Sequence, residues 1–310
     1  MTAEQVRQII HHKRFPHETK VVHLIETHIS WVLLADSDVY KIKKPLKLGF
    51  LDFSTLERRQ EACEAEVSLN RRLAPEMYLG VLPITRQGEN YQIGGPPREA
   101  VDYAVHMRRM DETRQMDILL EQDQVDPGQL RELAILLAHF HRHARKVPGG
   151  ESAAELGSAF GDIAGVIPVV ASILGSRAAA LLREVNQWMP GFLESVKERI
   201  EQRNALGYVI DGHGDLHCRN IFLTDPPVVF DCIEFNPDFR SLDMLNEIAF
   251  LCMDLERLGR PHYADLFLRR YLQENPVMQT LADQRLFCFF KLYRANVRIK
   301  VPCIRQGEVK

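Results

Sequence analysis

The sequence has no CxxC pair and no dense cysteine framework. Small disulfide-stapled domains and structural zinc modules need closely spaced cysteines. We therefore expect reduced thiols, mostly buried as small hydrophobic side chains. The six cysteines are spread along a chain of 310 residues, at Cys63, Cys218, Cys232, Cys252, Cys288 and Cys303.

Long apolar runs and excess charge are also lacking. No apolar run approaches the roughly 18 residues that a membrane-spanning helix needs, and the polar N-terminal segment does not have the apolar core of a secretory signal. The formal net charge is −3, and the basic stretch from Lys41 to Lys47 has no interleaved base-stacking aromatics. These absences predict a cytoplasmic protein with neither a nucleic-acid nor a membrane partner, and they leave its oligomeric state open.

The first third of the chain contains alternating strand signals around one helical pattern. No internal repeat or low-complexity segment interrupts it, and the length allows one large domain or two lobes. A helix is predicted from Ser54 or Thr55 to Ala74-Pro75. Strands are predicted at Val21–Ile25, Ser30–Ala35, Val39–Ile42, Val81–Thr85, Tyr91–Ile93 and Val101–Met107.

After Met110 the apolar residues recur mainly at helical spacing. Strands wrapped around one long helix, followed by a helical remainder, predict an α+β fold with two lobes, residues 1–110 and 111–310. Short strand signals return only at Ile221–Leu223 and Val228–Asp231. Helical stretches are predicted over Gln129–Arg145, Ala153–Leu156, Ile163–Leu174, Arg177–Asn204 with an interruption near Pro190, and Ser241–Val301 with breaks near Pro261 and Pro276.

The segment His213–Asn220 and the later Asp231 have the residue types that phosphoryl transfer requires. A carboxylate must orient the acceptor hydroxyl and receive its proton, while oxygen ligands hold Mg²⁺ against the phosphates. Asp215 and Asn220 are five positions apart, and Asp231 follows the apolar run Val228–Phe230. A polar loop whose Asp and Asn only cap a turn is the simpler alternative, but the whole combination favours catalysis.

The sequence HGDLHCRN resembles the H-G-D-x-H-x-x-N loop of the aminoglycoside phosphotransferase and choline kinase-like families, which are relatives of protein kinases. This resemblance implies a two-lobed protein kinase-like fold. It also implies that Asp215 is the catalytic base, that Asn220 and Asp231 bind Mg²⁺, and that His213 braces the loop. By the same resemblance, Asp243 supports the catalytic loop from a position further along the chain.

A kinase also needs a strand lysine on the phosphates, held by a glutamate from the helix of the small lobe. Lys41 and Lys43 point to one face of the strand Val39–Lys43, because side chains alternate. Lys41 is the first choice and Lys43 the second. Glu66 precedes Leu73 by seven positions, which resembles the spacing of the pairing glutamate in the phosphotransferase family, and Glu64 is the alternative.

The predicted nucleotide site has one unusual feature. The segment between the first two strands, Glu26–Ser30, contains no glycine, whereas protein kinases use a glycine-rich loop there. The resemblance still implies ATP as cofactor, with GTP as an alternative. The strand Val101–Met107 is expected to lead to a hinge that places Met107 and Met110 beside the adenine; ordinary core methionines are the competing interpretation.

Over nearly its full length the chain is similar to a bacterial aminoglycoside phosphotransferase-like group, through YKIKKP, FLDFSTLERR and NRRLAPEMY. Members of that group often carry an additional P-loop ATPase domain, and the sequence given has no GxxxxGK[ST] motif. His139, His141 and His143 have a spacing that could hold Zn²⁺, as could His213, His217 and Cys218. We interpret the first three as structural and the others as part of the kinase loop.

The expected acceptor is a hydroxyl group of a small molecule. Between Gly212 and Glu256 acidic residues outnumber basic ones nine to two, which favours a cationic acceptor such as an amino sugar or a choline-like compound. Two alternatives remain. One is a kinase-fold enzyme that modifies protein, although the interval from Asp231 to Asp243 is short for a peptide-docking segment; the other is a nucleotide-binding regulator without turnover.

Overall fold

The computed structural model describes residues 1–308, with side chains described as far as Cys303. Two compact units are present. The first consists of Met1–Gln115 together with Val228–Pro237, and the second consists of Met116–Pro227 together with Asp238–Lys310. The expected division at residue 110 assigned 228–237 to the C-terminal lobe, whereas in the structure this segment packs within the first unit.

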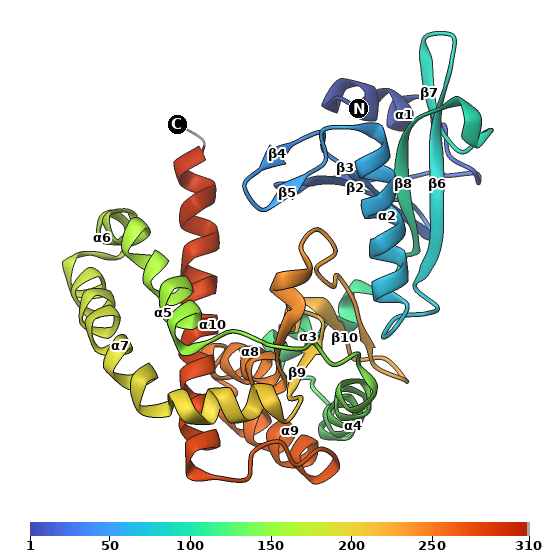
Figure 1. The fold of residues 1–310 in the computed structure, drawn as a ribbon. Coiled ribbons are helices and arrows are strands. Elements are labelled where there is room, and N and C mark those ends of the chain that lie inside the picture. Colours follow the sequence, from blue (N-terminus) through green and yellow to red (C-terminus); the bar gives the residue numbers. More distant parts are fainter. Residues whose placement is uncertain (309–310) are drawn as a thin grey trace. The chain divides into compact units, whose positions relative to one another are not determined.

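The first unit is built on a six-stranded antiparallel sheet with the order β1-β2-β3-β8-β6-β7 (Figure 1). Each predicted strand of the first third is found, with ends that differ by a few residues. The sheet strands are β1 His23–Glu26, β2 Ser30–Leu34, β3 Asp38–Lys43, β6 Tyr78–Gln87, β7 Asn90–Ile93 and β8 Ala100–Arg108; the unit also contains α1 Ala3–His11, β4 Lys47–Leu48, β5 Leu51–Asp52, α2 Leu56–Asn70 and β11 Val228–Val229.

The two faces of strand β3 have different environments. Tyr40 and Ile42 belong to an apolar cluster that includes Val6 and Ile9 of α1, whereas Lys41 and Lys43 alternate with them and point to the opposite face. Helix α2 packs against β8 and β6 on the sheet (Figure 1). It begins after Thr55, whose side chain accepts a hydrogen bond from the backbone N–H of Arg58.

The second unit is mainly helical. Helix α8 packs against α10 and α9, and α4 packs against α9 (Figure 1). Strand β9 pairs with β12 in an antiparallel arrangement. The elements are α3 Met116–Glu121, α4 Pro127–His143, α5 Ala153–Gly161, α6 Ile167–Leu174, α7 Ser176–Ala205, β9 Val209–Asp211, β10 Ile221–Phe222, β12 Ser241–Asp243, α8 Met244–Arg257, α9 Pro261–Glu274 and α10 Leu281–Glu308.

Three sequence-based expectations about this unit are wrong. Strands were expected only at Ile221–Leu223 and Val228–Asp231, but Val209–Asp211 and Ser241–Asp243, the latter expected to be helical, also form strands. Helix α7 continues through Pro190 without the predicted interruption. The stretch Ala153–Leu174 is, by length and composition, apolar enough to cross a membrane, although no such stretch was expected. It is divided into α5, a short 3-10 segment and α6. A single stretch of this kind does not indicate a membrane protein, because core helices of other proteins have the same composition.

Arg203, at the C-terminal end of α7, is buried and joins three elements of the second unit. Its guanidinium donates to both carboxylate oxygens of Asp243, at 2.6 and 2.8 Å, and to Asp283 of α10 at 2.7 Å. It also donates to the carbonyl oxygen of Val277. Buried charges are stable only when they are paired and hydrogen-bonded, so Arg203 and its two carboxylates depend on one another.

Replacing Arg203 by methionine is expected to destabilise the protein by about 3–5 kcal/mol, because Asp243 and Asp283 lose their shared partner inside the protein. Chemical denaturation with urea measures the change in unfolding free energy. The control is Arg269→Met on the exposed side of α9, which should change stability by less than about 0.5 kcal/mol. Equal stability of the two variants would contradict the structural role of Arg203.

Candidate active site

The predicted residues lie in two sets, one in each unit. In the first unit, Glu66 of α2 is fully buried and contacts both candidate lysines of β3. Its Oε1 accepts from Nζ of Lys41 at 2.8 Å, and its Oε2 accepts from Nζ of Lys43 at 2.6 Å. Glu64, the alternative, is exposed and accepts from Gln60. Both candidate lysines therefore bind the same glutamate, so contact with Glu66 does not distinguish between them.

Lys41 also contacts the predicted metal ligand. Its Nζ donates to Oδ1 of Asp231 at 2.7 Å. Asp231 has a positive φ of 61°, which is uncommon for a residue with a side chain, and its backbone N–H donates to the hydroxyl of Tyr78 at 3.2 Å. Such backbone conformations persist only where the surroundings enforce them and often occur at functional sites.

Lys43 contacts a second carboxylate that the sequence analysis did not identify. Its Nζ donates to Oε1 of Glu234, which follows Asp231 by three residues. The Lys43 side chain has no exposed surface, whereas that of Lys41 is 13% exposed. Of the two lysines, only Lys41 has exposed surface through which it could bind a ligand.

The charges of this group stabilise one another. Burial would lower the pKa of Lys41, but Asp231 and Glu66 outweigh burial and raise this pKa well above its ordinary value. Burial would likewise raise the pKa of Glu66, but Lys41 and Lys43 lower it to about 2. Burial raises the pKa of Glu234, and the attraction of Lys43 opposes this. Lys41, Lys43 and Glu66 are therefore charged at neutral pH, and Glu234 lies in direct contact with the Lys43 ammonium group.

The donors present in the first unit suit Mg²⁺. Two lysines and three carboxylates give the group a net charge of −1, and the outer carboxylate, Asp231, has a side chain that is 45% exposed. Mg²⁺ prefers oxygen ligands and commonly takes only one or two carboxylates, with waters and phosphates completing its coordination. Among the described residues no cluster of three or more His, Cys, Asp or Glu could hold a metal ion by itself.

The segment between β1 and β2 is a tight turn closed by side chains rather than by glycine. The hydroxyl of Thr27 accepts from the backbone N–H of Ser30 and donates to its carbonyl oxygen, both at 3.0 Å. Nζ of Lys44 donates to the carbonyl oxygen of Thr27 and to Glu26, both at 2.7 Å. The backbone of this turn is therefore fixed without the conformational freedom of a glycine-rich loop.

The two predicted hinge methionines are placed differently. Met107 is buried in β8, in register with Val39 and Tyr78 of the neighbouring strands. Met110 follows the end of β8 and is half-buried. Their contact with an adenine stays a prediction.

In the second unit, Asp215 and Asn220 lie on one loop after β9, as their spacing predicts. Nδ2 of Asn220 donates to the backbone oxygen of Asp215 at 3.0 Å and to its Oδ2 at 3.2 Å. These hydrogen bonds use the amide nitrogen of Asn220, so its amide oxygen is the atom suited to a metal ion. The Asp215 side chain is 37% exposed and can therefore meet a ligand.

Two histidines contact Asp215, one at its carboxylate and one at its backbone. Nε2 of His217 lies 3.4 Å from Oδ2 of Asp215, and Nδ1 of buried His213 accepts from the backbone N–H of Asp215 at 3.3 Å. Burial would raise the pKa of Asp215, but His217, His213 and Arg294 lower it well below its ordinary value. A carboxylate that stays ionised in this way can accept a hydrogen bond from an acceptor hydroxyl.

Glu247 of α8 supports the backbone of this loop. Its Oε1 accepts from the N–H groups of His213 and Gly214, both at 2.6 Å, and its Oε2 contacts Nε2 of His141 at 2.9 Å. A β-carbon on Gly212 would collide with the Glu247 carboxylate, so only glycine fits at that position. The resemblance assigned loop support to Asp243, but Asp243 instead binds Arg203 and caps α8 through the N–H of Leu245.

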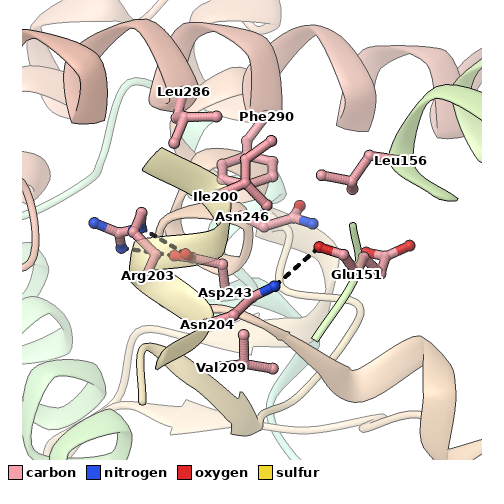
Figure 2. A pocket seen from close by; sticks show the side chains of 10 residues that line it. All are labelled: Glu151, Leu156, Ile200, Arg203, Asn204, Val209, Asp243, Asn246, Leu286 and Phe290. Atoms are coloured by element: carbon pink, nitrogen blue, oxygen red, sulfur yellow. Dashed lines mark hydrogen bonds and ion pairs between the residues drawn. The ribbon is translucent and has the colours of Figure 1, made fainter. Parts of the chain in front are cut away.

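Arg294 of α10 reaches the same loop from the other side. This buried guanidinium donates to the carbonyl oxygen of Gly214 at 3.1 Å and to Oδ1 of Asn246 at 2.7 Å, and it lies over the ring of Phe250. Asn246 also lines a small cavity of about 20 Å³ together with Glu151 (Figure 2). Burial raises the pKa of Glu151, and Arg294 opposes this shift.

The histidines of α4 have structural contacts, in agreement with the interpretation that we preferred over a zinc site. His141 is fully buried between Glu247 and the hydroxyl of Tyr271, which lies 2.7 Å from its Nδ1. The rings of His139 and His143 are tilted by 31° with their centres 4.2 Å apart, and Nδ1 of His143 lies 2.8 Å from the carbonyl oxygen of His139.

Three residues that the sequence analysis missed are central to these contacts: Glu234, Glu247 and Arg294. Glu234 could have been found from its position three residues after Asp231, combined with a second strand lysine that required a partner. Glu247 sits among apolar residues of α8, and a charged residue within an apolar run signals a buried partner. Nothing in the sequence distinguishes Arg294 from the neighbouring arginines.

Comparison with known proteins gives a consistent family. The model of the phosphotransferase enzyme family matches residues 36–282. An uncharacterised protein of Mycobacterium tuberculosis (strain ATCC 25618 / H37Rv) is 31% identical over 290 residues, which are 92% of this chain and 55% of the relative. The chain thus spans about half the length of the curated relatives that it matches.

Similarity to solved structures concerns the fold. A choline kinase from Cryptosporidium parvum Iowa II superposes with a TM-score of 0.53 at 12% identity, covering 98% of this chain and 97% of the other. A glucosamine kinase in complex with glucosamine, ADP and inorganic phosphate gives a TM-score of 0.47 at 15% identity, covering 94% and 80%. The predicted two-lobed kinase-like α+β fold is confirmed.

Glu247→Gln provides a pH test of the loop support. Burial would raise the pKa of Glu247, but His141, His213 and the N–H of Gly214 lower it to about 2, from an ordinary value of 4.5. A lowered pKa stabilises the fold above pH 4.5, and this contribution is lost as the pH falls towards 2. We expect the stability advantage of the wild type over Glu247→Gln to shrink by about 3 kcal/mol between pH 5 and pH 2.

Urea denaturation at several pH values measures this difference. Glu194→Gln, at an exposed position of α7, is the control and should differ from the wild type by an amount that hardly changes with pH. A difference between wild type and Glu247→Gln that stays constant across this range would show that the Glu247 carboxylate is not held in its ionised form.

Proposed function

Because the chain belongs to the phosphotransferase enzyme family, we propose that it transfers the γ-phosphate of ATP to a hydroxyl group of a small molecule with the help of Mg²⁺. The observation that carries this proposal is the Asp215–Asn220 pair, in which the asparagine amide holds the aspartate and leaves its carboxylate accessible. The chain of contacts Glu66–Lys41–Asp231 supports it from the first unit.

In the proposed reaction, Asp215 accepts a hydrogen bond from the acceptor hydroxyl and takes its proton as the oxygen attacks the γ-phosphorus. The bond between that phosphorus and the bridging oxygen to the β-phosphate breaks, and ADP leaves. Lys41 would bind the phosphates, and Asn220 and Asp231 would hold Mg²⁺. Bound Mg²⁺ neutralises charge on the phosphate oxygens. The depressed pKa of Asp215 keeps its carboxylate ionised at neutral pH, so that it can accept a hydrogen bond from the acceptor hydroxyl.

The charge count that favoured a cationic acceptor is weaker support once the structure is considered, because most of the acidic residues are paired. Of the nine acidic residues between Gly212 and Glu256, at least seven have a basic partner: Asp215, Asp231, Glu234, Asp243, Glu247, Asp254 and Glu256. The cavity beside Asn246 and Glu151 has a volume of only about 20 Å³, which is room for one water molecule, so it cannot hold such an acceptor (Figure 2). A cationic acceptor therefore remains part of the proposal on the charge count alone.

Nucleotide binding is tested by thermal unfolding with ATP or GTP, each with and without Mg²⁺. A ligand that binds the native state raises the melting temperature by mass action. For the wild type we expect an increase with ATP that depends on Mg²⁺. Asp231→Ala should lose the Mg²⁺-dependent part, whereas Asp215→Ala should retain nucleotide binding and lose turnover, because the base does not hold the nucleotide.

The outcomes separate the remaining alternatives. Mg²⁺-dependent binding without turnover on any acceptor would favour a nucleotide-binding regulator. A wild-type protein whose melting temperature responds to neither nucleotide would contradict the proposed function. Wild-type turnover in Asp215→Ala would remove the assignment of the catalytic base.

Acceptor preference is tested with ethanolamine, choline and glucosamine against their neutral counterparts ethylene glycol and glucose, by measuring ADP release. We expect higher kcat/KM with the cationic compounds than with their neutral counterparts. Equal or better use of the neutral compounds would exclude a cationic acceptor.

A further inference from the structure

We propose that Lys43 and Glu234 form a positioning pair that fixes the carboxylate of Asp231 for Mg²⁺, and that Lys43 does not bind phosphate. This inference rests on the proposed function and assigns a role within it to two residues outside the set Asp215, Asn220, Asp231 and Lys41. It also explains why β3 carries two lysines that both contact Glu66.

The burial and contacts of Lys43 exclude direct ligand binding. Its side chain has no exposed surface, and its ammonium group lies between Glu66 and Glu234. It also lies over the ring of Phe53, 5.1 Å from the ring centre. An ammonium group has three donors, and this one uses two of them on buried carboxylates. Lys43 therefore joins two segments of protein, α2 and residues 228–237.

The segment that carries Asp231 is fixed to the first unit at successive residues. The N–H of Asp231 donates to Tyr78, and the N–H of Cys232 donates to Oδ1 of Asn70 at 2.9 Å. These two hydrogen bonds hold the backbone on one side of the segment. Glu234 provides the next anchor through Lys43. Because Asp231 adopts a left-handed backbone conformation, we infer that the direction of its carboxylate depends on these anchors at residues 231, 232 and 234.

Lys43 and Asp231 are also connected by a chain of contacts through Glu66 and Lys41. Glu66 gives one oxygen to Lys43 and the other to Lys41, and Lys41 binds Asp231. If Lys43 were absent, Glu66 and Glu234 would both lose a partner inside the protein, and Lys41 would be drawn towards the unpaired oxygen. The position of the Asp231 carboxylate is thus set from both ends of the same chain of contacts.

The Mg²⁺ affinities of two variants distinguish a positioning role of the pair from a simple effect of its charge. Glu234→Gln changes the net charge of the group from −1 to 0, and Lys43→Met changes it from −1 to −2. If only charge mattered, the first variant would bind Mg²⁺ more weakly and the second more tightly. If position matters, both variants bind it more weakly. The double variant restores the net charge of −1 without restoring the contact.

The test is a titration of Mg²⁺ at saturating ATP in which the melting temperature is measured at each Mg²⁺ concentration. It compares the wild type, each single variant, the double variant and Glu234→Asp. We expect the apparent Mg²⁺ affinity to fall roughly 10- to 100-fold in both single variants and in the double variant, as is typical when a residue that orients a metal ligand is lost. Glu234→Asp keeps the charge and should recover part of the affinity. ATP binding measured in EDTA should stay close to that of the wild type.

Glu4→Gln removes an exposed carboxylate that pairs with Arg7 on α1 and serves as the matched control. If a single variant does not unfold cooperatively, the double variant decides, because it leaves fewer unpaired buried charges. Tighter Mg²⁺ binding by Lys43→Met, or wild-type affinity in the double variant, would overturn the positioning role. A wild type that shows no Mg²⁺-dependent binding would instead overturn the proposed function, so the two failures are distinguishable.

Discussion

The arrangement of charged side chains in the first unit depends on the contacts of the fully buried Glu66 carboxylate. A glutamate without solvent is stable as an anion only if charged partners replace the lost water, and here two lysines of β3 do so, one at each oxygen. Each lysine then needs a second carboxylate, which Asp231 and Glu234 provide. A helix, a central strand and a distant segment of the chain are thereby fixed relative to one another by five side chains.

In the second unit the buried polar groups that need partners are mainly backbone groups rather than side-chain charges. The loop that contains Asp215 and Asn220 has several N–H and C=O groups inside the protein, and each needs a partner. Glu247 accepts from two of its N–H groups, Asp254 accepts from the N–H of Cys218, and Arg294 donates to the carbonyl oxygen of Gly214. The loop is therefore held along its length by α8 and α10, while the Asp215 carboxylate stays accessible.

Local patterns were sufficient to predict the strands around α2, the helical character of the remainder and the fold class, because burial at period 2 and period 3.6 leaves a direct trace in the sequence. They were insufficient for α1, whose apolar positions Val6 and Ile9 stand among polar residues, and for Pro190, which the tertiary packing of α7 tolerates. Spacing located Asp215, Asn220 and Lys41, whose roles stay predictions. Glu234 and Arg294 were missed because long-range partners are set by tertiary structure.

The membership of Val228–Pro237 in the first unit has a consequence for the order in which the protein matures on the ribosome. When residue 115 has been synthesised, the sheet and α2 are complete, but Lys41 and Lys43 still have only Glu66 between them. More than a hundred further residues must emerge before Asp231 and Glu234 can reach them. Until then Lys41, Lys43 and Glu66 carry a formal net charge of +1 inside the N-terminal part of the nascent chain. The first unit therefore completes its folding only after most of the helical unit has been synthesised.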